Sequence, residues 1–135
     1  MHHGIIESLY PNPLDSLFEK HQNAYFSVDA ALMLEYSLHD TCMYDKNQFM
    51  TNLGSDVLYK RLLSESVDVW KPVIEKHPKR MMWGTDLYYW WHYEPDVIHE
   101  IVGFGRDFIA HLDPEVQERF AYRNAVDMFN ILRSD

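Results

Sequence analysis

The segment Lys79–Asp86 constrains the fold of this chain more than any other stretch. It follows a helix-ending His-Pro pair, runs from basic to apolar residues and then to two small residues, and stops on the carboxylate of Asp86. A short apolar run between breaking residues is typical of a strand buried on both faces of a parallel sheet. Parallel α/β folds place their chemistry at the carboxyl ends of their strands. We therefore predict a parallel strand with Asp86 at its functional end, while a carboxylate that only caps a loop stays an open alternative.

A second segment repeats this order of elements nearer the start of the chain. Asn12 and Pro13 form a helix-initiating pair, and the helix that they predict ends near His21. Residues 24–29 then have the composition of another buried strand, which again finishes on an acid, Asp29. We expect Asp29 to form hydrogen bonds at the strand end and not to be catalytic. Two strands that each follow a helix indicate the crossover units of a parallel α/β fold.

The segments between and after these strands are mostly helical in pattern. Residues 30–36 could form a helix, and the mixed, polar residues 39–52 predict a long loop. A helix is expected from Asp56 to about Leu63, and Ser66 can cap another. Glu94-Pro95 and Asp113-Pro114-Glu115 begin the later helices. The residues expected on the buried side of the closing helices are Val116, Phe120, Ala125, Met128, Phe129 and Leu132.

The composition narrows the class of partner. The chain has 135 residues and a formal net charge of -9, with acidic residues spread along its length. Such a charge argues against a nucleic-acid backbone or an anionic membrane as partner, and no apolar run approaches the ~20 residues of a membrane span. Cys42 is the only cysteine, so an internal disulfide is impossible and a reducing compartment is favoured. We expect a soluble, acidic, cytoplasmic α/β chain.

The number of strands predicts an incomplete fold. A parallel sheet needs both faces covered and rarely stands with so few strands. A full (β/α)8 barrel needs ~250 residues, well beyond this length. We therefore predict an α/β fold in which residues 1–135 form a single partial domain, the C-terminal part of a TIM-like (β/α)8 barrel. The open sheet edge should make the isolated chain self-associate, as a homo-oligomer in the simplest case.

The sequence around Asp86 resembles the last barrel strand of the amidohydrolase superfamily, in its amidohydrolase-related branch. That branch includes the aminocarboxymuconate-semialdehyde decarboxylase-like enzymes. The residues that carry the resemblance are Trp83-Gly84-Thr85-Asp86 with the preceding His77-Pro78-Lys79-Arg80, the closing Leu112-Asp113-Pro114-Glu115, Phe120, Asn124-Ala125 and Phe129, and the upstream His2-His3-Gly4 and Asn23–Asp29. By this resemblance the chain would span about strands 6/7 to 8 of the barrel with its closing helices.

The resemblance also implies roles for individual residues. Asp86 would be the eighth-strand aspartate, which binds or lies beside a divalent metal, usually zinc, and takes the proton of the attacking water. His2 or His3 would be the sixth-strand histidine, which polarises the substrate or assists proton transfer. Both registers stay open, with His2 favoured by its His-x-Gly spacing. We expect Asn124 to be a structural cap or bridge.

The aromatic run after Asp86 has two interpretations. Tyr88, Trp90 and Trp91, with His92 beside them, could line a pocket for an aromatic or unsaturated substrate. Equally, they could be loop residues that pack on the barrel rim.

The chain departs from the family pattern in its metal ligands. The family's first-strand His-x-His pair and its fifth-strand ligand are absent here. A lone aspartate cannot hold catalytic zinc, which takes three protein ligands. Some members of the branch use the same aspartate as a base without metal. The resemblance therefore implies zinc, or another divalent metal, only in the complete protein, and a metal-independent mechanism stays open.

The activity that the resemblance implies is hydrolysis or decarboxylation of a small carboxylated substrate. The aromatic run after Asp86 suggests that this substrate is aromatic. The chain would be the C-terminal part of such an enzyme. Two alternatives stay open, a non-catalytic chain that completes a barrel and a structural α/β module in which Asp86 has no chemical role.

Overall fold

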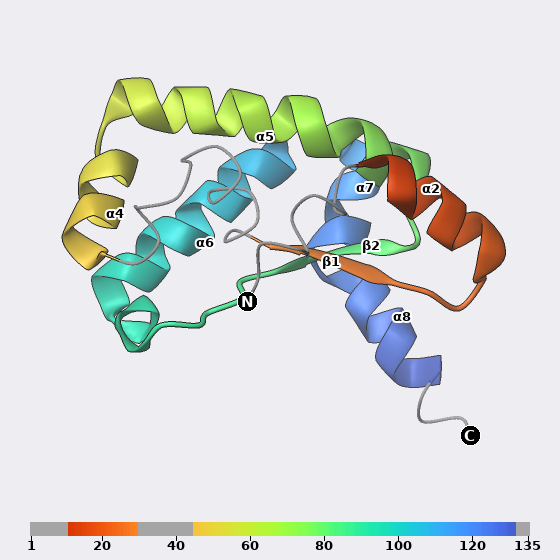
Figure 1. Cartoon of the computed structure of the whole chain (residues 1–135). Coiled ribbons are helices and arrows are strands. Elements are labelled where there is room, and N and C mark those ends of the chain that lie inside the picture. The colour runs from red at the N-terminus through yellow and green to blue at the C-terminus, as the bar shows by residue number, and fades with distance from the viewer. Residues whose placement is uncertain (1–10, 30–44, 132–135) are drawn as a thin grey trace.

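The computed structural model describes residues 11–29 and 45–131, which form a mixed α/β fold that is mostly helical. Its elements are α2 (Pro11–Lys20), β1 (Phe26–Asp29), α4 (Lys46–Leu53), α5 (Asp56–Lys76), β2 (Met81–Gly84), the 3-10 helix η1 (Trp90–Tyr93), α6 (Pro95–Ala110), α7 (Pro114–Glu118), the π-helix η2 (Arg119–Arg123) and α8 (Asn124–Ile131). In Figure 1 the long helix α5 runs along one side of the molecule with α2 at its end, and α8 extends from the opposite side of the two strands. Residues 30–36, where the sequence predicts a helix, and Cys42 lie outside the described residues.

Strands β1 and β2 form a two-stranded parallel sheet. They pair from Phe26 opposite Met81 to Asp29 opposite Gly84. Each strand follows a helix, α2 before β1 and α5 before β2. The two predicted strands and their parallel pairing are therefore confirmed, whereas the larger barrel stays a prediction.

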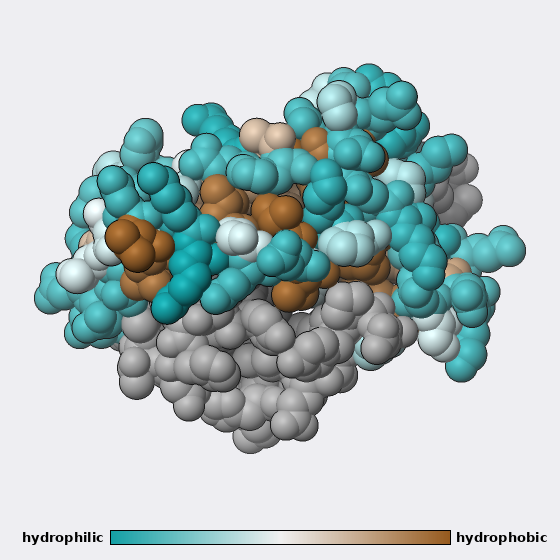
Figure 2. Space-filling model, turned by 90° about the horizontal axis from the view of Figure 1, so that it is seen from above, coloured by the Kyte–Doolittle hydropathy of each residue, from teal (hydrophilic) through white to brown (hydrophobic). Residues whose placement is uncertain are grey.

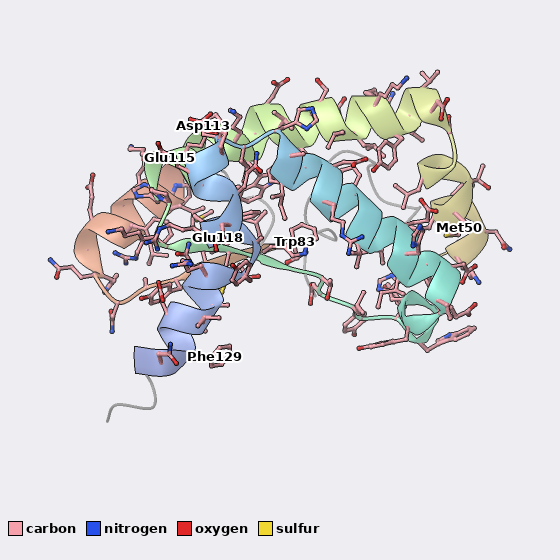
Figure 3. All side chains as sticks on the ribbon, turned by 180° about the vertical axis from the view of Figure 1, so that it is seen from behind. Met50, Trp83, Asp113, Glu115, Glu118 and Phe129 are labelled. Atoms are coloured by element: carbon pink, nitrogen blue, oxygen red, sulfur yellow. The ribbon has the colours of Figure 1, made fainter. Side chains whose placement is uncertain are left out.

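The hydrophobic core joins this sheet to helices α5 and α6. Its fully buried side chains include Val28, Leu62, Ile74, Met81, Val97, Phe104, Phe108 and Phe120. Helix α6 packs against the Trp83 side chain of strand β2 at Gly105, where an added Cβ would lie 2.2 Å from Cζ2 of Trp83. In Figure 3, Trp83 lies between the strands and the helices. A glycine at position 105 thus lets the indole ring lie directly against the helix backbone.

One continuous helix, α5, replaces the two helices that the sequence predicts here. The prediction that Ser66 caps a second helix is wrong, because this residue is buried in the middle of α5. The buried positions Leu62, Ser66, Trp70 and Val73 keep a helical spacing through this point, so a single stripe faces the core. Pro72 consequently lies in the helix interior, on its exposed side.

Helix α4 corrects the prediction of a loop over residues 39–52, of which 39–44 are not described. Asp45 caps this helix, since its Oδ1 accepts a hydrogen bond from the backbone N–H of Gln48 at 2.8 Å. Phe49 and Leu53, four residues apart, are both buried and attach the helix to the core. The sequence predicts a loop here because most residues of the segment are polar, although its few apolar residues are enough to attach a helix to the core.

The closing segment contains a π-helical turn between α7 and α8. Val116 and Phe120 are buried as predicted, and Ala125 and Met128 are half-buried. Phe129 is 60% exposed, so the prediction that it faces the core is wrong. A π-turn adds a residue to the helical turn and rotates the positions after it. Figure 3 accordingly shows Phe129 on α8, away from the strands; Leu132 is not described.

Asn124 fixes this closing segment to strand β2. The residue is 1% exposed, and its Nδ2 donates to the carbonyl oxygens of Pro78 at 2.8 Å and Met81 at 2.7 Å. The guanidinium of Arg119 donates to the Asn124 Oδ1 at 3.4 Å. The predicted bridging role of Asn124 is confirmed.

The surface of the described part is largely polar. Figure 2 shows hydrophilic residues over most of the face seen from above, with hydrophobic residues in smaller groups between them. The exposed large apolar side chains include Val57 on α5, Tyr88 and Trp90 near η1, and Phe129 on α8. No helix of the described residues is long and apolar enough to span a membrane.

Candidate functional site

Two acidic residues lie at the carboxyl ends of the two parallel strands. Asp29 ends β1 directly opposite Gly84, the last residue of β2, and Asp86 follows two residues later. Asp29 is 8% exposed, whereas Asp86 is exposed. Neighbouring parallel strands end at the same edge, so the sheet presents one buried and one accessible carboxylate there.

The absence of a side chain at Gly84 lets the two strand ends lie close together. A Cβ at this position would lie 2.6 Å from the Ser27 Oγ and 3.7 Å from the Asp29 Cβ. The first distance is shorter than any ordinary contact, so a larger residue would displace the Ser27 hydroxyl. The close approach of the Ser27 hydroxyl therefore explains why a glycine occupies position 84.

Asp86 has an unusual backbone conformation. Its φ is +45°, the only positive value at a non-glycine residue in the part of the chain that the structure describes. Aspartate is among the few residues that tolerate the left-handed region, and such conformations cluster at functional sites. The chain therefore turns sharply at Asp86, immediately after the strand.

The aromatic residues after this turn separate into two groups. Tyr88 is 72% and Trp90 is 77% exposed, so both are available to a ligand. Trp91 is 4% exposed and belongs to the core. Its ring centroid lies 5.4 Å from that of Phe49 and 5.7 Å from that of Tyr89. The structure thus places Tyr88 and Trp90 at the surface, two and four residues after Asp86, and Trp91 in the position of a packing residue.

His92 is the residue of this region whose importance the sequence conceals. It is 2% exposed, and its Nδ1 accepts hydrogen bonds from the backbone N–H groups of Tyr88 at 3.2 Å and Tyr89 at 3.4 Å. Burial lowers the pKa of His92, and the negative charge of Asp86 opposes this shift. Its Nε2 is buried without a hydrogen-bond partner in the described structure. The only signal in the sequence is a histidine within an aromatic run after a strand-end aspartate.

The described residues do not form a metal site. No group of three or more His, Cys, Asp and Glu side chains among them is arranged to hold a metal ion. Catalytic zinc takes three protein ligands, so Asp86 alone does not fit it. His2 and His3, the candidates for the sixth-strand histidine, lie outside the described residues.

Comparisons with protein-family models, curated proteins and solved structures found no match to this chain. The resemblance to the amidohydrolase superfamily therefore depends on the sequence motifs alone.

Proposed function

We propose that this chain is the C-terminal part of an amidohydrolase-type enzyme that acts on a small carboxylated substrate by hydrolysis or decarboxylation. One observation carries the proposal: Asp86 is an exposed carboxylate held in a left-handed conformation at the carboxyl end of a parallel strand. This is the place where parallel α/β enzymes position their catalytic groups. The motif around Asp86 adds the reaction class.

In this proposal Asp86 is the general base. For hydrolysis, its carboxylate takes a proton from the attacking water and returns it to the leaving group. For decarboxylation, the carboxylate first takes a proton from water, and when the carbon–carbon bond to CO2 breaks, the Asp86 carboxyl gives that proton to the carbon left behind. Tyr88 and Trp90 are exposed two and four residues after Asp86 and would contact an aromatic substrate with their rings. His2 would polarise the substrate, as the resemblance implies.

A divalent metal, zinc above all, belongs to this proposal only through residues beyond those that the structure describes. Asp86 can contribute one carboxylate ligand, and further ligands would have to come from elsewhere in the complete protein. The role of Asp86 as a base does not require the metal, so the proposal holds for a metal-independent member of the branch as well.

The substitution Asp86→Asn tests the proposed function. Asparagine also tolerates a positive φ, so the fold should survive while the base is lost. We expect turnover by the protein that contains this chain to fall by ~10²–10⁴, the usual cost of removing a general base. The measurement is kcat on a panel of small carboxylated aromatic compounds, followed for both hydrolysis and release of CO2, together with a thermal melting curve.

Two control variants make this result specific. Asp68→Asn removes the same charge from an exposed position of α5, and Thr85→Ser keeps the hydroxyl next to Asp86. Both should leave turnover nearly unchanged. Equal turnover of a folded Asp86→Asn variant and the unaltered protein would remove Asp86 from the mechanism.

A second candidate is a non-catalytic chain that completes a barrel with a separate piece. The observation that favours it is the small sheet, since two parallel strands rarely stand alone. Under this candidate Asp86→Asn changes neither turnover nor assembly, so the same variant separates the two.

A further inference from the structure

The loop between β2 and η1 connects the proposed base to the core, and its conformation needs an explanation. Residues 85–88 belong to no helix or strand. Two side chains of η1 reach back to this loop: His92 accepts from Tyr88 and Tyr89, and the Tyr93 hydroxyl donates to the carbonyl oxygen of Leu87 at 2.9 Å. The short helix after the loop therefore holds the loop in place.

The ring of His92 is itself fixed. Its centroid lies 4.1 Å from that of Trp91, 5.3 Å from that of Tyr89 and 6.1 Å from that of Phe49. A ring nitrogen that accepts two N–H groups carries no proton, so the proton of the neutral ring is on Nε2. The ring is thus a rigid acceptor that is pointed at the backbone just after Asp86.

We propose that His92 is the positioning residue of the Asp86 loop, and that its Nδ1 acts as the latch by accepting the N–H groups of Tyr88 and Tyr89. A left-handed aspartate persists only where its surroundings fix it from both sides. The pairing of β2 fixes Asp86 from the preceding side. The two bonds to His92 fix it from the following side, two and three residues later.

The unpaired Nε2 supports a role for the acceptor nitrogen. A buried donor without a partner is unfavourable, and a phenylalanine at this position would fill the core without that penalty. The ring nitrogen that does have partners, Nδ1, is the property that phenylalanine lacks. The consequence for catalysis, that the latch sets the geometry of the base, rests on the proposed function; the latch itself does not.

The first test is the protonation state of the ring in the full 135-residue chain. We expect the nitrogen NMR spectrum of His92 at pH 7.5 to show an unprotonated Nδ1 and a protonated Nε2. A proton on Nδ1 would overturn the proposal, because that nitrogen could not accept either N–H group. This measurement needs no variant.

The second test compares two substitutions by amide hydrogen exchange. His92→Phe keeps a planar ring and removes the acceptor, and we expect the amides of Tyr88 and Tyr89 to exchange at least ~10-fold faster, with the β2 amides unchanged. His92→Asn places a carbonyl oxygen near the position of Nδ1 and should restore most of the protection. His99→Phe, on an exposed position of α6, is the matched control and should change nothing.

The outcomes separate the latch from the proposed function. Unchanged protection of both amides in His92→Phe, or a folded His92→Asn variant that exchanges as fast as His92→Phe, would overturn the latch. Asp86→Asn should leave the protection intact, whatever it does to turnover. Full turnover of Asp86→Asn with an intact latch would refute the proposed function and leave this inference standing.

Discussion

The two ends of the β1–β2 pair are built in opposite ways. At the amino end, Arg80 donates from Nε to the carbonyl oxygen of Ala24 at 2.6 Å and places its guanidinium 5.0 Å from the ring centroid of Phe18. The buried amide of Asn124 binds the backbone there too, at Pro78 and Met81. At the carboxyl end the chain turns through a left-handed Asp86 into a loop that hydrogen bonds with the buried His92 ring and the Tyr93 hydroxyl hold in place.

This difference indicates that the two ends of the sheet contribute to different properties of the protein. Many hydrogen bonds to backbone carbonyls secure the end where the strands begin. The end where they finish carries an exposed acid, exposed aromatic rings and backbone strain. Strain at a functional site persists only when the rest of the structure compensates for it. Substitutions at the amino end should therefore change stability, and substitutions at the carboxyl end should change local order and, under the proposed function, turnover.

The largest effect on stability is expected for Asn124→Ala at the amino end. The variant leaves the half-buried carbonyl group of Pro78 and the buried one of Met81 without their donor, at about 1–3 kcal/mol for each group that stays unsatisfied. We expect the free energy of unfolding to fall by roughly 2–4 kcal/mol. Urea unfolding followed by circular dichroism measures it.

Asn47→Ala is the control for this experiment. Asn47 is exposed on α4, so its substitution should stay within about 0.5 kcal/mol of the unaltered chain. If Asn124→Ala unfolds at the same urea concentration as Asn47→Ala, the amino end is not the secured end, and the comparison between the two ends loses its basis.

A smaller effect is expected where helix α6 meets the middle of strand β2. Gly105→Ala places a methyl group against the ring of Trp83, 2.2 Å from its Cζ2. Overpacking of this kind costs about 1–3 kcal/mol, and the better helix propensity of alanine offsets only part of it. A lower melting temperature is the expected result.

Gly103→Ala is a closely matched comparison in the same helix. A Cβ there meets nothing within 4 Å among the neighbouring atoms, so only the gain in helix propensity remains. This variant should stabilise the chain by about 0.5–1 kcal/mol. Two variants with melting temperatures shifted in the same direction would show that Trp83 does not fix the distance between α6 and the sheet.

The parts of the fold that follow from local signals could be predicted from the sequence. Clear breaking residues and a clear hydrophobic pattern mark three of these parts, which are strand β1, strand β2 and helix α6. Ser66 misled because a residue that often caps helices can also lie within one when no breaker precedes it. Phe129 misled because a π-turn shifts the helical phase, and no residue type marks such a turn.

The candidate site could be predicted only in part. The sequence indicates Asp86 at a strand end, since the order of apolar, small and acidic residues is local. It does not show that Trp90 is exposed while Trp91 is buried, because that depends on the contact of Trp91 with Phe49 of α4. The acceptor role of His92 is also beyond the sequence, since it needs the loop to fold back onto the ring.

The smallest expected effect is a difference in the acid sensitivity of the two ends. Burial lowers the pKa of His92 below its ordinary 6.5, so the unfolded chain takes up this proton first as the pH falls. The stability that depends on neutral His92 is therefore present above pH 6.5 and is lost below it. The negative charge of Asp86 reduces this effect, and the charged groups Lys46, Glu94 and Asp96 beside η1 form an ion-pair network of their own.

At the amino end the corresponding group is Asp15 of α2. Its hydrogen bonds with Lys76, and then with His77, hold the pKa of this carboxyl below its ordinary 3.8. Stability that depends on ionised Asp15 is thus present above pH 3.8 and is lost only below that value. Acidification should loosen the carboxyl end first, and the amino end more than two pH units later.

Thermal melting between pH 7.5 and pH 3, with hydrogen exchange of the Tyr88 and Tyr89 amides, measures this order. His92→Asn removes the titrating group but keeps an acceptor, so its melting temperature should be flatter between pH 6.5 and pH 4.5. Asp15→Asn should leave that range unchanged and flatten the profile only below pH 3.8. If the melting temperature falls with pH above pH 4.5 as steeply in His92→Asn as in the unaltered chain, a group other than His92 causes the loss of stability in that range. The two ends would then differ in their hydrogen bonds but not in their response to acid.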